Sequence, residues 1–216
     1  MQKAVPKELN FLNLLEITKA ISGIDHFIFF GTLLGIIRDD DIIPHDDDID
    51  IYVDIDLKKD LILALEGKGF NVDETKYPNL TEFFLQLKIQ RGSIQTYVDF
   101  YFYDSSDQNF IVEKWNFKGD VENNYENIHI PKNLIFPLQR YSFKKIELTI
   151  PAKPKEVCAF LYGNKWNIPL KKETQYFTAM ILNRPFIFYG RIGFFLVKKI
   201  RKFQYFKLKF RNFILK

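Results

Sequence analysis

Cysteine is almost absent from this chain. Cys158 is the single one among 216 residues, so no disulfide can form within the chain. No apolar run reaches the roughly 18 residues that a membrane-spanning helix needs, and residues 1–8 lack the apolar core of a signal peptide. The sequence shows no internal repeat and no low-complexity linker. These absences lead us to expect a cytoplasmic protein with no need for an oxidising compartment.

Acidic residues are missing from the C-terminal part. Residues 174–216 hold ten Lys and Arg but no Asp or Glu, which leaves 21 basic and 27 acidic residues in the remainder. Residues 186–216 place aromatic and apolar residues at helical spacing with lysines opposite, a pattern typical of a helix on an anionic membrane surface. A terminal helix packed on the domain, with a solvated basic face, fits the same pattern. Nucleic-acid binding is disfavoured because the body of the chain is acidic.

Apolar and aromatic residues are plentiful. They make up 47% and 17% of the chain, enough for a packed core. Their periodicity predicts helices over residues 10–21, 32–38, 57–66 and 154–162. It predicts strands over residues 27–30, 48–54, 70–73, 83–90, 93–103, 128–130 and 140–150. This order favours an α/β or α+β fold, with a mixed sheet flanked by helices.

The chemistry is concentrated in a glycine turn and the acidic cluster that follows it. Asp48 and Asp50 are two residues apart on a predicted strand, so both carboxylates point to one face. Such a pair is unfavourable unless a cation lies between the two charges, and ligands that are all oxygen favour Mg²⁺ or Mn²⁺. Gly31 and Thr32 open a short helix whose N-terminal N–H groups suit a phosphate. The combination predicts phosphoryl or nucleotidyl transfer.

A third acid, Asp99, interrupts the apolar run of residues 97–101. If its strand lies beside the strand of Asp48 and Asp50, three carboxylates can hold one or two divalent ions, and Asp99 can accept the proton of an attacking hydroxyl. Arg38 would neutralise a diphosphate. Taken singly, each feature also has a plainer interpretation. The acidic run fits a solvated turn, and Asp99 fits an edge-strand residue facing water. Gly31 fits an ordinary strand-to-helix turn, and Arg38 fits a cap at the C-terminus of its helix. Their joint order and spacing favour the functional interpretation.

Two segments carry a resemblance to a known family. Residues 31–38 (GTLLGIIR) and 43–51 (IPHDDDIDI) resemble the signature of the LicD family, which includes bacterial phosphocholine transferases and the fukutin-type proteins of animals. Val98-Asp99-Phe100 resembles its third acidic position. Residues 162–166 (YGNKW) resemble the Tyr-Gly-x-x-Trp element near the end of its catalytic domain. The resemblance covers about residues 10–172.

The resemblance implies a nucleotidyltransferase fold of the polymerase-β type over residues 1–172, followed by a basic helical extension over 173–216. It implies metal-dependent transfer of phosphocholine, phosphoethanolamine, glycerol phosphate or ribitol phosphate from a CDP-activated donor to a sugar hydroxyl of a cell-surface glycan, with release of CMP. Two alternatives stay open. One is a nucleotidyltransferase that places an NMP on a small molecule or RNA, and the other is an inactive membrane-associated scaffold.

The same resemblance implies roles for individual residues. Asp48, Asp50 and Asp99 match the catalytic, metal-binding acids of the family. With Arg38 added, the predicted substrate-binding residues are Gly31, Thr32, Arg38, His45, Asp46 and Trp166. His45 stands where the family often has Trp, and Trp166 fits a core position equally well. The expected partners are the CDP-alcohol donor and a glycan acceptor that is free or lipid-linked. The third is an anionic membrane surface, the inner face of the cytoplasmic membrane.

Overall fold

The computed structural model describes residues 6–44, 46, 48–73, 82–113 and 128–169. The chain divides into two compact units, residues 1–159 and 160–216, and only the first is described over most of its length. The predicted boundary at residue 172 and the predicted helix over 186–216 lie outside the described residues. Among the helices that are described, none combines the length and the apolar character needed to cross a membrane.

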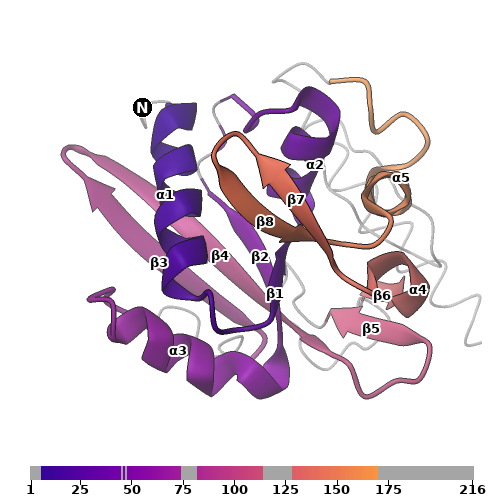
Figure 1. Ribbon diagram of the computed structural model, residues 1–216, viewed down its shortest axis with the longest axis horizontal. Helices are drawn as coiled ribbons and strands as arrows, with labels where there is room; N and C mark the ends of the chain where they lie inside the picture. Colours follow the sequence, from indigo (N-terminus) through magenta and orange to yellow (C-terminus); the bar gives the residue numbers. More distant parts are fainter. Residues whose placement is uncertain (1–5, 45, 47, 74–81, 114–127, 170–216) are drawn as a thin grey trace, which may run out of the picture. The chain divides into compact units, whose positions relative to one another are not determined.

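The first unit alternates helices and strands (Figure 1). The helices are α1 (Lys7–Ala20), α2 (Phe30–Asp39), α3 (Lys58–Glu66), α4 (Lys132–Ile135) and α5 (Pro154–Tyr162), the last reaching into the second unit; the 3-10 turn η1 (Ile55–Leu57) precedes α3. The strands are β1 (His26–Ile28), β2 (Asp50–Asp54), β3 (Phe84–Arg91), β4 (Ile94–Asp104), β5 (Phe110–Glu113), β6 (Ile128–Pro131), β7 (Gln139–Phe143) and β8 (Ile146–Ile150).

Six of these strands form one mixed sheet. Its order is β1-β2-β4-β5-β6, with β3 also paired to β4. β2 and β4 run parallel, and every other pair in this sheet is antiparallel. The predicted mixed α/β sheet is therefore confirmed. Its central pair, β2 and β4, joins the two strands that the sequence marks as chemically important.

The two faces of the sheet differ in character. Side chains alternate along a strand, so Ile51 and Val53 of β2 lie on the same face as Phe100 and Phe102 of β4, with which they are in register. All four are fully buried. Helix α1 contacts both β4 and α3, and Figure 1 shows these two helices together against the sheet. Asp50 and Asp99 lie on the opposite face.

Three predictions about the glycine turn and its strands were wrong. The strand predicted over residues 27–30 ends at Ile28, and α2 begins at Phe30, before its predicted start at Thr32. Phe29 N–H donates to Asp50 O at 3.0 Å, which continues the β1–β2 pairing by one residue, and Phe30 then turns the chain with a φ of 38°. β2 begins at Asp50, so Asp48 lies in the segment before the strand.

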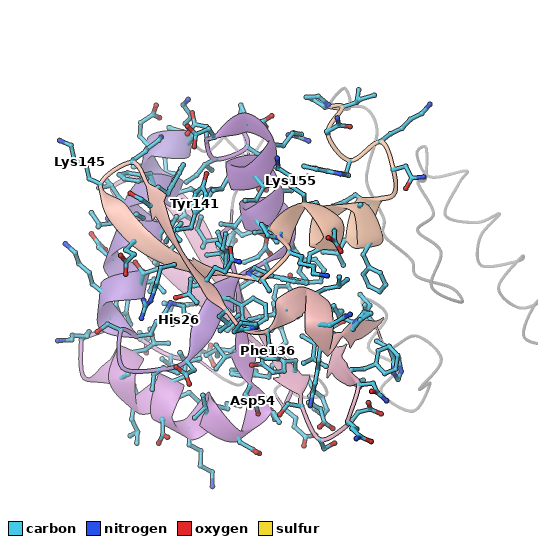
Figure 2. The ribbon with its side chains drawn as sticks, turned by 45° about the vertical axis from the view of Figure 1, so that its right-hand side comes forward. His26, Asp54, Phe136, Tyr141, Lys145 and Lys155 are labelled. Atoms are coloured by element: carbon cyan, nitrogen blue, oxygen red, sulfur yellow. The ribbon has the colours of Figure 1, made fainter. Side chains whose placement is uncertain are left out.

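Other departures concern the periphery. Residues 70–73 form no strand, and the segment 140–150 is a hairpin of β7 and β8 with Lys144 in the left-handed region at a φ of 53°. Figure 2 shows Lys145 at the tip of this hairpin pointing outward. The helix over residues 154–162 agrees with its prediction, and Gly163 follows it with a φ of 83°.

Candidate active site

Asp50 and Asp99 lie side by side at the start of the parallel pair. They are register partners in β2 and β4, and the backbone fixes that register because Asp99 N–H donates to Ile49 O at 2.8 Å. Residues directly aligned on parallel strands present their side chains to the same face. Each of the two is only 5% exposed. The strand of Asp99 therefore lies beside the strand of Asp50, which the sequence alone could not establish.

Gly31 lies against two carboxylates of this site. A Cβ atom built on Gly31 would be 3.1 Å from Asp46 Oδ2 and 3.2 Å from Asp50 Oδ2. Its backbone φ lies outside the left-handed region, so the requirement for glycine comes from close approach rather than from the backbone. A side chain here would push both carboxylates away.

Gly35, the second glycine of the turn, has a different task. A Cβ atom at this position would be 2.8 Å from Asp41 O and 2.9 Å from Ile43 Cγ1. The absence of a side chain lets the segment after α2 fold back onto the helix. Gly31 thus makes room for the acids, and Gly35 makes room for the backbone that leads to them.

The carboxylates share one electrostatic environment. Burial raises the pKa of Asp50 well above its usual range, and the charges of Asp48, Asp46 and Asp99 raise it further. Burial also raises the pKa of Tyr101 well above its usual range, with added contributions from Asp50 and Asp99. At neutral pH, the Tyr101 phenol therefore keeps its proton beside the acids.

Hydrogen bonds fix the orientation of the two central acids. Thr32 N–H donates to Asp50 Oδ2 at 3.2 Å, and Asp50 N–H donates to the Thr32 hydroxyl oxygen at 2.9 Å. Gln86 Nε2 donates to Asp99 Oδ1 at 2.9 Å, across the antiparallel pairing of β3 and β4. Thr32, predicted to face a phosphate, thus has the additional role of holding Asp50 in place.

Basic and acidic residues at and just after the end of α2 form ion pairs. Arg38 contacts Asp39 through two hydrogen bonds, Nε to Oδ1 at 2.9 Å and Nη2 to Oδ2 at 2.6 Å. Asp41 accepts from Lys7 and, at 2.7 Å, from Lys144. The assignment of Arg38 to a diphosphate stays a prediction, and it requires Arg38 to bind the diphosphate in addition to, or instead of, Asp39.

The donor set suits a hard divalent cation in charge and in ligand type. All its groups are carboxylates, one of them buried among like charges, and oxygen ligands are those that Mg²⁺ and Mn²⁺ prefer. Within the part of the chain that the structure describes, no three His, Cys, Asp or Glu side chains already stand close enough to hold a metal ion. The ligand roles of Asp48, Asp50 and Asp99 stay predictions.

The other predicted substrate residues fall elsewhere. His45 lies outside the described residues. Trp166 belongs to the second unit, where its backbone N–H donates to Gly163 O at 3.0 Å. The structure adds residues that the sequence analysis passed over. Gln86 and Tyr101 lie on the carboxylate face, because Gln86 is in register with Asp99 and Tyr101 is two residues further along β4. Alternation along the predicted strands could have placed them there.

Comparison with known proteins identifies the family. The model of the LicD/FKTN/FKRP nucleotidyltransferase domain matches residues 23–153, which is more than half of the chain. The chain belongs to the LicD/FKTN/FKRP family. The predicted family and the predicted nucleotidyltransferase type of domain are confirmed. The match runs from the turn before β1 to the start of α5, and so includes the whole carboxylate site.

Curated relatives match about two thirds of the chain. Ribitol-5-phosphate transferase FKTN from Homo sapiens, Macaca fascicularis and Mus musculus is in each case 30% identical over 152 residues. The match covers 69% of this chain and 31% of each relative, so the chain spans about a third of their length. Among solved structures, the lincosamide antibiotic adenylyltransferase LnuA with bound lincomycin is 16% identical, with a TM-score of 0.46 over 70% of this chain and 84% of that chain.

Proposed function

We propose that this protein is a divalent-metal-dependent phosphotransferase that moves a phospho-alcohol group from a CDP-activated donor to a sugar hydroxyl of a glycan, releasing CMP. One observation supports this above all: Asp50 and Asp99 are aligned on neighbouring parallel strands, inside a domain of the LicD/FKTN/FKRP family. Ribitol phosphate is the first alcohol to test, because ribitol-5-phosphate transferase is the name of the related proteins. Phosphocholine, phosphoethanolamine and glycerol phosphate follow.

The cation would be held by Asp48, Asp50 and Asp99. When bound, Mg²⁺ or Mn²⁺ would neutralise the negative charge of the donor diphosphate, which is the chemistry that such ions supply in phosphoryl transfer. Asp50 is already surrounded by the charges of Asp46, Asp48 and Asp99, and a divalent cation would remove that repulsion.

The remaining residues divide the work of the transfer. Asp99 would accept the proton of the attacking sugar hydroxyl, with Gln86 holding its Oδ1 oxygen in place. Gly31 would let the donor phosphate approach the start of α2, where the helix dipole favours negative charge. Arg38 and Asp46 would contact substrate beside these acids, and the substrate roles of His45 and Trp166 stay predictions.

The test is an assay of CMP release. The full chain is incubated with Mg²⁺ and each of CDP-ribitol, CDP-choline, CDP-ethanolamine and CDP-glycerol, together with a panel of saccharides, and products are read by mass spectrometry. We expect CMP and a saccharide that carries the phospho-alcohol. An NMP left on the acceptor instead would indicate nucleotidyl transfer.

A matched pair of variants makes the assay specific. Asp99→Asn removes the proposed base and ligand, and we expect transfer to fall by at least about 10²-fold, the lower end of what a general base contributes. Asp54→Asn is the control. Asp54 lies at the other end of β2, where it accepts from Asp56 N–H (Figure 2). Full activity of Asp99→Asn would rule out its role.

The basic C-terminal segment offers a separate proposal, that residues 186–216 attach the protein to an anionic membrane surface. It rests on the sequence pattern of ten Lys and Arg without an acid in residues 174–216. Replacing Lys198, Lys202 and Lys209 by Gln should weaken binding to vesicles that contain an anionic lipid. Unchanged binding would end this part of the proposal.

A further inference from the structure

Two asparagines on α1 are completely buried, which is unusual for amide side chains. Asn10 and Asn13 are each 0% exposed, although they lie on the helix face that packs on the sheet. A buried amide is costly unless its hydrogen bonds are made. Leucine at these positions would have served helix packing better, so the two amides point to a role other than packing.

The hydrogen bonds of Asn10 lead to the acidic segment. Its Nδ2 donates to the backbone oxygen of Asp46 at 2.8 Å and to that of Asp48 at 3.3 Å. These two carbonyls belong to two of the acids that raise the pKa of Asp50. Asn10 therefore holds the backbone of this segment, while Asp46 Oδ2 lies against Gly31.

Asn13 extends the contact to the strand that carries Asp99. Its Nδ2 donates to Asn10 Oδ1 at 3.4 Å and to the Thr96 hydroxyl of β4 at 2.8 Å. The hydroxyl of Thr96, which is fully buried, donates to Ile89 O at 3.1 Å. The two asparagines thus join the segment of Asp46 and Asp48 to β4, three residues before Asp99.

The outer end of this network is anchored by charge. Arg91 Nε donates to Asn13 Oδ1 at 2.8 Å, and Arg91 Nη2 pairs with Glu16 Oε2 at 2.7 Å. The guanidinium therefore fixes which way the Asn13 amide faces, and Asn13 in turn orients Asn10. A polar network whose members are all hydrogen-bonded is rigid, and it specifies one arrangement of the elements it joins.

We infer that Asn10 is a positioning residue of the proposed phosphotransferase site: together with Asn13, it sets where Asp46 and Asp48 stand relative to the strand of Asp99. This inference rests on the proposed function for its catalytic meaning. Helix α1 contributes none of the predicted ligands. Its role in this inference is to hold the segment of Asp46 and Asp48 at a fixed distance from the strand of Asp99.

The test compares variants of Asn10 with a control variant on the same helix. Asn10→Leu keeps the branching and the number of side-chain heavy atoms and removes both donors without adding a charge. Asn10→Ala is made alongside in case the larger leucine side chain prevents folding. Leu14→Ala is the control, because Leu14 is also fully buried on α1 and its truncation destabilises the protein without removing a bond to the acidic segment. All proteins are compared at a temperature where thermal unfolding shows each to be folded.

The first measurement is hydrogen exchange, which needs no activity. Ile49 N–H donates to Tyr97 O at 3.1 Å and Asp46 N–H donates to Ile43 O at 3.3 Å, so both amides report on the acidic segment. In Asn10→Leu we expect exchange at these amides to quicken by at least about tenfold relative to the helix α3 amides. Equal acceleration in Leu14→Ala, or none in either asparagine variant, would overturn the inference.

The second measurement is Mn²⁺ affinity by calorimetry. Partners that orient metal ligands typically contribute 10- to 100-fold to affinity, and we expect a loss of about that size in Asn10→Leu but not in Leu14→Ala. Affinity equal to that of the unmodified protein would contradict a positioning role. If the unmodified protein binds no Mn²⁺ and releases no CMP, the proposed function fails, and the exchange data alone decide whether Asn10 positions the segment.

Discussion

Thr32 and Asp50 exchange two hydrogen bonds across the junction of α2 and β2. The Thr32 N–H donates to the Asp50 carboxylate at 3.2 Å, and the Asp50 N–H donates to the Thr32 hydroxyl at 2.9 Å. Both residues are buried, at 3% and 5% exposure. These two hydrogen bonds therefore fix the first turn of α2 relative to the carboxylate of Asp50.

Replacing Thr32 by Val should damage both stability and transfer. The substitution leaves the buried Asp50 N–H without its acceptor, which costs about 1–3 kcal/mol. Thr32→Ser keeps the hydroxyl and loses one methyl group, so it should cost about 1 kcal/mol. Urea unfolding and CMP release measure the two effects. If Val and Ser variants behave alike, the hydroxyl does not hold Asp50.

Substituting the two glycines, Gly31 and Gly35, should affect different properties, transfer in one case and stability in the other. In Gly31→Ala, the new methyl displaces the carboxylates of Asp46 and Asp50, and we expect about 10- to 100-fold less transfer with little change in unfolding free energy. In Gly35→Ala, the methyl meets backbone atoms, and we expect a loss of about 1–3 kcal/mol in unfolding free energy.

Gly23→Ala serves as the control for both glycine variants, because a Cβ atom there would meet nothing within 4 Å. It should leave both transfer and stability close to those of the unmodified protein. The account of Gly31 would be contradicted if Gly31→Ala retained full activity, and that of Gly35 if Gly35→Ala unfolded like Gly23→Ala.

Removing the charge of Asp50 should stabilise the metal-free protein. Because burial and the neighbouring acids raise its pKa in the folded state, the ionised carboxylate opposes folding at neutral pH. Asp50→Asn removes that charge and keeps an oxygen for the Thr32 N–H. We expect a higher melting temperature without divalent ions, by about 2–4 °C for each kcal/mol gained, together with loss of transfer. A lower melting temperature at pH 7 would show that the crowding of charge is not costly.

The ionised carboxylate of Asp41 should stabilise the folded protein at neutral pH, the opposite of the effect expected for Asp50. Its hydrogen bonds with Lys144 and Lys7 lower its pKa in the folded state, so its contribution to stability is present at neutral pH and declines as pH falls below the unfolded value of about 4. All three side chains are partly exposed, so Asp41→Asn should cost about 1 kcal/mol at most at pH 7. In urea unfolding, the difference from the unmodified protein should shrink by pH 3, and a difference that persists there would refute the ion-pair account.

Patterns local in sequence predicted much of the fold. The β3–β4 hairpin, α3 and α5 lie within a few residues of their predicted bounds, because apolar period and glycine stops act over short distances. The β7–β8 turn was missed for a related reason. Lys144 takes a left-handed conformation that carries no glycine or asparagine signal, and its ion pair with Asp41 joins residues far apart in the chain.

The candidate site was predictable in its residue types but not in its assembly. The sequence marks Asp50 and Asp99, yet only the parallel pairing of β2 and β4 brings them together, and such pairing leaves no local trace. Thr32 was predicted to open its helix, whereas the helix begins at Phe30 and the Thr32 hydroxyl accepts from the Asp50 N–H of β2. The burial of Asn10 could not be predicted from periodicity, because a helical pattern is recognised by its apolar residues and does not identify a buried amide.

The most direct test of the central claim is titration of Mn²⁺ into the full chain by calorimetry, for the unmodified protein, Asp50→Asn, Asp99→Asn and the control Asp54→Asn. The account predicts that the unmodified protein and Asp54→Asn bind the ion alike, and that Asp50→Asn and Asp99→Asn each bind it at least about tenfold more weakly. Equal affinity in all four proteins would contradict a cation centre built on the paired strands β2 and β4.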